Sequence, residues 1–207
     1  MNNIKLSYAI TVCNETFEIQ KLLSFLNIHK REQDEVVVLY DETNGDPIIK
    51  SNLLKNPTIQ FHSGKFHGHF ANWKNHLNSL CTGDFIFNID ADEIPHQSLL
   101  VHLPEILKGN PNNEVYLVPR VNTVEGITDE HTTKWGWNVD AKGWVNWPDY
   151  QWRIWKNKPD IKWINKVHER LEGFRTYATL PQEEEFALYH PKEIKRQEKQ
   201  NKYYDTL

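Results

Sequence analysis

The stretch Gly83-Asp84-Phe85-Ile86-Phe87-Asn88-Ile89-Asp90-Ala91-Asp92-Glu93 decides the fold of this 207-residue chain. Its apolar run follows a Gly-Asp turn and is typical of a buried strand in a parallel sheet. Because side chains alternate along an extended chain, Asp90 and Asp92 are expected on the same face, at the strand's carboxyl end. Ligands of open α/β sheets bind at that edge. Two carboxylates there suit Mg²⁺ or Mn²⁺, which shares its coordination with substrate phosphates. The alternative is a solvated acidic turn in which Asp90 caps the next helix.

Composition excludes several classes of protein. The net charge is −4 and the pI is near 6.2, which does not favour a nucleic-acid surface. The sequence contains no run of 18 apolar residues, so no transmembrane helix is expected, and its first residues lack the pattern of a signal peptide. Cys13 and Cys81 form neither a disulfide framework nor a metal-binding pattern, which favours a reducing compartment.

Strands and helices are expected to alternate through the first half of the chain. Strands are predicted at residues 4–12, 35–40, 58–61 and 85–89, and helices at 14–29, 48–54 and 68–81, the first of them capped by Asn14. This alternation implies right-handed crossovers and a doubly wound sheet. Asp41, at the end of the second strand, is placed to bind a base or ribose, or else is a turn residue. The sequence lacks Gly-x-Gly-x-x-Gly and Gly-Lys-Ser/Thr, which disfavours dinucleotide binding and P-loop chemistry.

The second half is expected to be less regular. A helix at 98–108 contains Pro104, and a strand at 115–121 is predicted to be irregular at Pro119. Further strands are predicted at 148–157, 163–169 and 185–191, followed by a charged surface helix from 192 to 204.

Several of these motifs together resemble family 2 glycosyltransferases with the GT-A fold. They are Thr11-Val12-Cys13-Asn14-Glu15, Asp41, Asn72-Trp73-Lys74-Asn75, and the stretch from Gly83 to Glu93. The resemblance implies a Rossmann-like, mostly parallel sheet flanked by helices, with an aromatic-rich C-terminal acceptor part. It also implies a nucleotide-diphosphate-sugar donor (a UDP-sugar is favoured), Mn²⁺ or Mg²⁺ on Asp90 and Asp92, and transfer with inversion.

The same resemblance assigns roles to residues around the donor. Thr11, Glu15 and Asp41 would contact the nucleoside, Lys74 would approach the donor, and Asp90 would bind ribose, metal or both. One departure concerns the turn after the second strand, where the sequence reads Tyr-Asp-Glu-Thr-Asn-Gly, whereas the family usually has Asp-x-Gly-Ser.

Pro-Asp-Tyr-Gln-x-Arg-Ile at 148–154 and Val-His-Glu at 167–169 resemble members that include lipopolysaccharide-core glucosyltransferases. GT-A enzymes often place a histidine late in the chain near the metal or diphosphate, and His190 is the first candidate and His168 the second. Either is alternatively a hydrogen-bonded structural imidazole. The catalytic base is predicted to be Asp149 or Glu169, with a slight preference for Asp149. Alternatively, Asp149 caps a turn, and Glu169 pairs with Arg153 or Arg170.

Seven of the eight tryptophans lie between residues 135 and 163. We expect most of these rings in the core, and one or two of Trp135, Trp137 and Trp144 in a groove for a glycan or other hydroxyl acceptor, because aromatic rings stack on sugars. The prediction is therefore a single domain, residues 1–207, with a nucleotide-sugar half (1–109), an acceptor half (110–191) and a C-terminal helix (192–207). A cytoplasmic location is expected, with membrane contact through the acceptor left open.

Two other functions remain open at this point. A nucleotidyltransferase shares the architecture but usually carries a glycine-rich basic loop after the first strand, and residues 11–17 contain neither glycine nor a basic residue. A non-catalytic carbohydrate-binding module explains the tryptophans but not the Asp-x-Asp motif.

Overall fold

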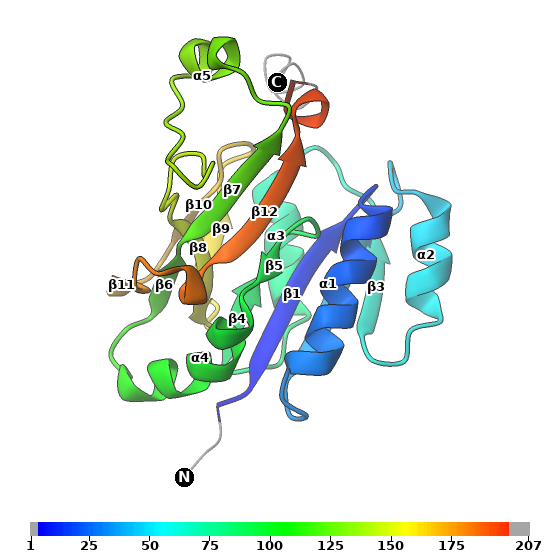
Figure 1. Ribbon diagram of the computed structural model, residues 1–207. Coiled ribbons are helices and arrows are strands. Elements are labelled where there is room, and N and C mark those ends of the chain that lie inside the picture. Colours follow the sequence, from blue (N-terminus) through cyan, green and yellow to red (C-terminus); the bar gives the residue numbers. More distant parts are fainter. Residues whose placement is uncertain (1–3, 199–207) are drawn as a thin grey trace.

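The computed structural model describes residues 4–198 and has a seven-stranded central sheet between helices (Figure 1). The strand order is β11-β6-β8-β4-β1-β2-β3. The strands of the first half are β1 (Leu6–Val12), β2 (Glu35–Asp41), β3 (Gln60–Gly64) and β4 (Phe85–Asn88). These four pair in parallel, as the alternation of strands and helices predicts.

Helices cover both faces of this sheet. On one face α1 (Thr16–His29), α2 (Pro47–Leu54) and α4 (Gln97–Gly109) pack against the alternate side chains of β1, such as Tyr8 and Ile10. On the other face α3 (Phe70–Ser79) packs on Ala9 and its neighbours. All seven residues of β2 are buried, because the strand pairs with β1 and β3 on its two sides and helices cover both faces of the sheet. The first half therefore folds as predicted, with one correction at the start of α1. Glu15, not Asn14, precedes the helix.

Pro119 divides the next predicted strand in two, which confirms the expected irregularity. β6 (Val115–Val118) stays in the central sheet, beside β11 (Tyr177–Thr179). β7 (Arg120–Glu125) joins a separate three-stranded sheet with β12 (Leu188–Glu193) and β5 (Ile94–Pro95). β8 (Gln151–Lys156) lies antiparallel between β4 and β6. The second sheet thus places β12 beside β5, the short strand that follows the turn after β4.

The predicted strand at 163–169 is wrong. A short hairpin, β9 (Lys162–Ile164) and β10 (Arg170–Glu172), takes its place, and residues 165–169 form the connecting loop. Asn165 (φ 72°) and His168 (φ 52°) adopt left-handed backbone conformations, which interrupt an extended strand. The Phe70 amide donates to the Lys166 carbonyl at 3.0 Å, so this loop packs against the start of α3.

Three further segments complete the described chain. The sequence did not predict α5 (Asp129–Trp135), which stands away from the sheets (Figure 1). The predicted strand at 185–191 begins instead with a 3₁₀ turn, η1 (Glu184–Phe186), before β12. The predicted C-terminal helix starts at residue 194, and its part beyond 198 lies outside the described residues.

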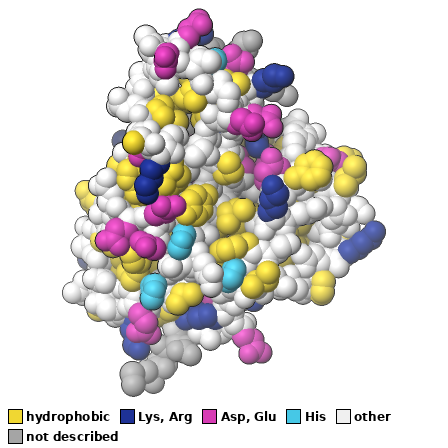
Figure 2. Space-filling model, viewed as in Figure 1, with side chains coloured by type: hydrophobic (Ala, Val, Ile, Leu, Met, Phe, Trp, Pro, Cys, Tyr) yellow, Lys and Arg dark blue, Asp and Glu magenta, His cyan; other side chains and the backbone are white. Residues whose placement is uncertain are grey.

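The surface that carries α1 and β12 shows acidic and basic side chains interspersed among polar and apolar ones (Figure 2). Within residues 4–198, no helix is both long enough and apolar enough to cross a membrane.

Candidate active site

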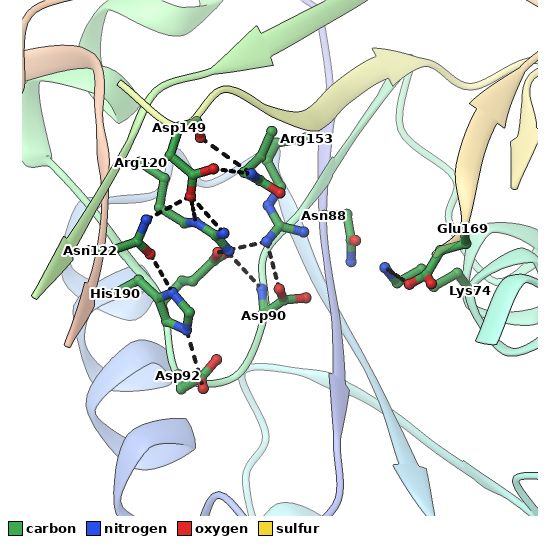
Figure 3. A network of polar contacts seen from close by, with 12 residues as sticks. Lys74, Asn88, Asp90, Asp92, Arg120, Asn122, Asp149, Arg153, Glu169 and His190 are labelled. Atoms are coloured by element: carbon green, nitrogen blue, oxygen red, sulfur yellow. Dashed lines mark hydrogen bonds and ion pairs between the residues drawn. The ribbon is translucent and has the colours of Figure 1, made fainter. Parts of the chain in front are cut away.

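The Asp-x-Asp motif forms a tight turn directly after β4, at the carboxyl edge of the parallel strands (Figure 3). The Glu93 amide donates to the Asp90 carbonyl at 2.9 Å, and the Asp90 amide donates to Glu93 Oε2 at 3.1 Å. Asp90 is half-buried and Asp92 is 15% exposed, while the Glu93 side chain is completely buried. The turn therefore holds the three carboxylates in different environments.

Glu93 is the centre of a buried ion network. Its Oε1 accepts from Arg153 Nη2 at 2.6 Å and from Arg120 Nη1 at 3.1 Å. Arg153 also donates to Asp90 Oδ2 at 2.5 Å, and Arg120 donates to Asp149 Oδ2 through Nε at 2.8 Å. Charges consequently alternate from Asp149 to Asp90, and this alternation is what makes their burial tolerable.

The network shifts the ionisation of its members. Burial acts to raise the pKa of Asp90, but the charge of Arg153, followed by that of Lys74, lowers it well below its usual range. Burial acts to lower the pKa of Arg153, but the charges of Asp90 and Glu93 raise it. Both groups are therefore charged throughout the neutral pH range.

A second chain of contacts runs from Asp149 to Asp92. Asn122 Nδ2 donates to Asp149 Oδ2 at 2.6 Å, and Asn122 Oδ1 lies 2.8 Å from His190 Nδ1. Because the amide oxygen can only accept, Nδ1 of His190 carries the proton. His190 Nε2 then faces Asp92 Oδ2 at 3.5 Å, and this partner outweighs the effect of burial and lowers the pKa of Asp92. Asn122 thus holds the His190 ring with Nε2 turned towards the Asp92 carboxylate.

Asp149 lies in a strained part of the loop before β8. Its φ is 34° and that of Asn146 is 54°, both in the left-handed region that non-glycine residues rarely adopt. The Asp149 amide donates to the Asn146 carbonyl at 3.0 Å, which closes this turn. The Asp149 carboxylate is 25% exposed, and its Oδ1 accepts a hydrogen bond from the side-chain Nε2 of Gln151 at 3.0 Å. The turn directs the carboxylate onto Arg120 and Asn122.

A cavity of about 260 Å³ opens beside Asp149. Arg120, Asn122 and His190 also line it, and so does Trp137. The other two candidate acceptor tryptophans pair with neighbouring rings, Trp135 with Trp137 at 4.7 Å and Trp144 with Trp147 at 4.9 Å. Trp137 is therefore the candidate that the structure brings to the polar network. A larger cavity of about 430 Å³ between α1 and α2 has no titratable side chain in its lining.

The expectation that most of the seven tryptophans lie in the core is wrong. Trp155 and Trp163 are buried, whereas the other five are half-buried. Four of these five lie on α5 or in the loop after it, outside the layers of sheet and helix, so their rings cover one another. The fifth, Trp152 on β8, packs against Phe174 beside the core.

The nucleoside candidates lie around the carboxyl ends of β1 and β2. Thr11 is half-buried in β1, and Glu15 Oε2 accepts the amides of Cys13 and Asn14 at 2.9 and 3.0 Å. Asp41 is 4% exposed, and its carboxylate accepts from the Thr43 amide at 2.7 Å. The amide of Phe66 and the side chain of Asn44 also donate to Asp41, at 3.2 Å each. In this structure Asp41 shapes its own turn.

Lys74 and Glu169 bind each other, at 2.5 Å, on the α3 side of the sheet. Figure 3 shows this pair apart from the cluster around Asp149, with Asn88 between them. The alternative pairing of Glu169 with Arg153 or Arg170 is wrong, because Arg153 binds Asp90 and Glu93, and Arg170 binds Glu172.

His168 lies exposed in the loop at 165–169, whereas the ring of His190 faces Asp92. Of the two candidate histidines, His190 is therefore the one that the structure pairs with the motif.

Sequence reasoning missed four polar residues of the network: Glu93, Arg120, Asn122 and Arg153. Two signals were available. Arg153 interrupts an otherwise apolar segment of β8, and a buried arginine needs an anionic partner. Glu93 follows the motif directly, on a turn that buries it.

Comparison with known proteins agrees with this architecture. No protein-family model and no curated protein matches the chain. Among solved structures it is similar to S. aureus TarS, with a TM-score of 0.62 and 14% identity over 91% of this chain. The same protein in complex with UDP-GlcNAc gives a TM-score of 0.63, and its complex with UDP gives 0.56, again with 14% identity. The chain has the GT-A fold.

This result confirms the predicted mixed α/β architecture with a mostly parallel sheet. The chain spans about 60% of the TarS chain that it matches. At 14% identity this similarity shows a shared fold and does not by itself assign an activity.

Proposed function

We propose that the chain is a family 2 glycosyltransferase that moves a sugar from a nucleoside diphosphate, in the first place UDP, to a hydroxyl group of a glycan. The observation that carries the proposal is the chain of contacts Asp149–Asn122–His190–Asp92. It joins a candidate base to a candidate metal site across one cavity, at the edge of the sheet where ligands bind. The complexes of the structurally similar TarS with UDP-GlcNAc and UDP support a UDP-sugar as donor.

Asp92 and His190 are the side chains that fit a divalent cation. The oxygen of Asp92 and Nε2 of His190 are atoms of the kinds that Mn²⁺ accepts as ligands, and Mg²⁺ needs only one or two protein carboxylates when a diphosphate supplies further oxygens. In residues 4–198 no group of three or more His, Cys, Asp or Glu side chains is placed to hold a metal, which leaves such positions to the diphosphate and water. A bound cation would stabilise the negative charge that develops on the leaving diphosphate.

Asp90 is positioned differently from Asp92. Arg153 fixes its carboxylate from the β8 side, and Glu93 fixes its amide. Asp90 therefore maintains the shape of the turn and, in this proposal, presents its remaining acceptor positions to the donor ribose or the cation. In this proposal Thr11, Glu15 and Asp41 contact the nucleoside, and Lys74, which binds Glu169, approaches the donor.

Asp149 is the proposed base. Arg120 and Asn122 occupy its Oδ2, whereas Oδ1 accepts a hydrogen bond from Gln151. A carboxylate oxygen accepts two hydrogen bonds, so Oδ1 retains capacity for an acceptor hydroxyl in the cavity. Asp149 would take the proton of that hydroxyl while the hydroxyl oxygen bonds to the anomeric carbon and the bond from that carbon to the diphosphate breaks, with inversion. Glu169 is less suited, because it pairs with Lys74 in a separate part of the site and does not line the cavity beside Asp149.

Product analysis tests this function. The protein is incubated with Mn²⁺ and a panel of UDP-, GDP- and CMP-sugars, with and without glycan acceptors, and the released nucleotide is identified by mass spectrometry. Release of a nucleoside diphosphate that Asp92→Asn abolishes supports transfer of a sugar. Release of pyrophosphate in a parallel incubation with nucleoside triphosphates and sugar 1-phosphates would indicate a nucleotidyltransferase, and no reaction with any donor sugar would count against the proposal.

A further inference from the structure

The last described residues contact Asp92, the carboxylate proposed above to bind the cation. Residues 194–198 begin a helix directly after β12, the strand that carries His190. From this segment Arg196 extends to Asp92, with Nη2 lying 3.2 Å from Asp92 Oδ2. The segment thus closes over the turn that follows β4.

The guanidinium of Arg196 also binds the start of α1. Nη2 lies 3.3 Å from Glu15 Oε1, and Nη1 lies 3.2 Å from Glu18 Oε1. Glu15 is itself fixed, because its other oxygen accepts two backbone amides of the β1–α1 connection. One arginine therefore joins three carboxylates from two separate segments, and the planar fork of a guanidinium suits this arrangement.

Asp92 Oδ2 is the oxygen at which Arg196 and the cation site overlap. It is the atom that faces Arg196 Nη2 at 3.2 Å and His190 Nε2 at 3.5 Å. A cation bound between Asp92 and His190 would use that oxygen, and its positive charge would repel the guanidinium. Binding of either cation at this oxygen therefore disfavours binding of the other.

We propose that Arg196 and the divalent cation compete for Asp92, so that residues 194–198 form a latch over the donor end of the site that cation binding releases. This inference rests on the proposed function of Asp92 as a metal ligand. Arg196 is 40% exposed, and ion pairs at such positions are individually weak. The latch therefore opens easily, and its closed population reduces the apparent affinity for the cation.

Titration of the full chain with Mn²⁺ alone, with free Mn²⁺ followed by electron paramagnetic resonance, tests the latch. Arg196→Gln should bind Mn²⁺ about threefold more tightly or better, because one competitor is gone. Glu18→Gln should also bind Mn²⁺ more tightly, although it removes a negative charge, since it loosens Arg196. Lys195→Gln, which changes the exposed neighbour, serves as the matched control and should bind like the wild type.

Unchanged or weaker Mn²⁺ binding by Arg196→Gln overturns the latch. Weaker Mn²⁺ binding by Glu18→Gln also overturns the latch, because it would mean that the negative charge of Glu18 attracts Mn²⁺ and does not act by holding Arg196. If the wild type binds UDP with Mn²⁺ and the variants fail these expectations, only the latch is wrong. If neither the wild type nor any variant binds Mn²⁺, and Mn²⁺ does not promote UDP binding, the proposed function fails together with it.

Discussion

Replacing Glu93 with glutamine tests whether the buried ion network stabilises the fold. The side chain of Glu93 is completely buried, and its carboxylate accepts hydrogen bonds from Arg153, Arg120 and the Asp90 amide. Glutamine keeps the shape and one acceptor oxygen. It removes the negative charge that Arg120 and Arg153 share, however, and its NH₂ group then faces one of the N–H donors that the carboxylate accepted. Loss of one partner in a buried pair typically costs 3–5 kcal/mol, and because glutamine retains an acceptor we expect about 3 kcal/mol.

Thermal unfolding, followed by circular dichroism, measures this loss. For a chain of this size, about 3 kcal/mol corresponds to a fall in Tm of roughly 6–12 °C. Glu105→Gln is the matched control. Glu105 lies on α4 with its side chain 77% exposed, 3.8 Å from Lys108, and its replacement should change stability by less than about 0.5 kcal/mol. If Glu93→Gln unfolds within about 1 °C of the wild type, the charge of Glu93 does not stabilise the fold.

Three further predictions address the base, the acceptor and the effect of pH. Asp149→Asn should lower kcat by about 10²- to 10⁴-fold with UDP affinity intact, whereas Glu169→Gln should not, and equal losses in steady-state kinetics would contradict the assignment. Trp137→Ala should raise the acceptor KM about two- to tenfold without changing donor binding, and unchanged acceptor kinetics would remove Trp137 from the groove. Burial raises the pKa of Glu35, but hydrogen bonds from Lys5 and two hydroxyl groups lower it to about 2. Its stabilising effect is therefore complete above about pH 4.5 and is lost as the pH falls towards 2, so denaturant titrations of Glu35→Gln should show a deficit at pH 7 that shrinks over this range.

Local sequence patterns predicted the parallel part of the sheet well. The segments that became β1, β2 and β4 are apolar runs bounded by polar turns, and such runs have few stable alternatives to a buried strand. The break at Pro119 was also visible, because proline cannot donate to a central ladder. The loop at 165–169 could not be recognised from the sequence, because Asn165 and His168 adopt positive φ values where the loop packs against α3.

The site was predictable only in part, because several of its residues come from segments that are far apart in the sequence. Asp90 and Asp92 stand together in sequence, and the strand before them fixes their place. The arginines that hold this turn come from β7 and β8, and only the tertiary fold brings Arg120 and Arg153 to Glu93. The pairing of His190 with Asp92 likewise depends on a second sheet that local patterns did not reveal.

Calorimetric titration of UDP into the protein, with and without Mn²⁺, measures whether the chain holds a nucleotide through a cation on Asp92. The wild type should bind UDP in the presence of Mn²⁺ and much more weakly without it, and Asp92→Asn should lose the effect of the metal. The Glu105→Gln control should bind as the wild type does. A folded protein that binds none of UDP, GDP and CMP, with or without Mn²⁺, would contradict the account.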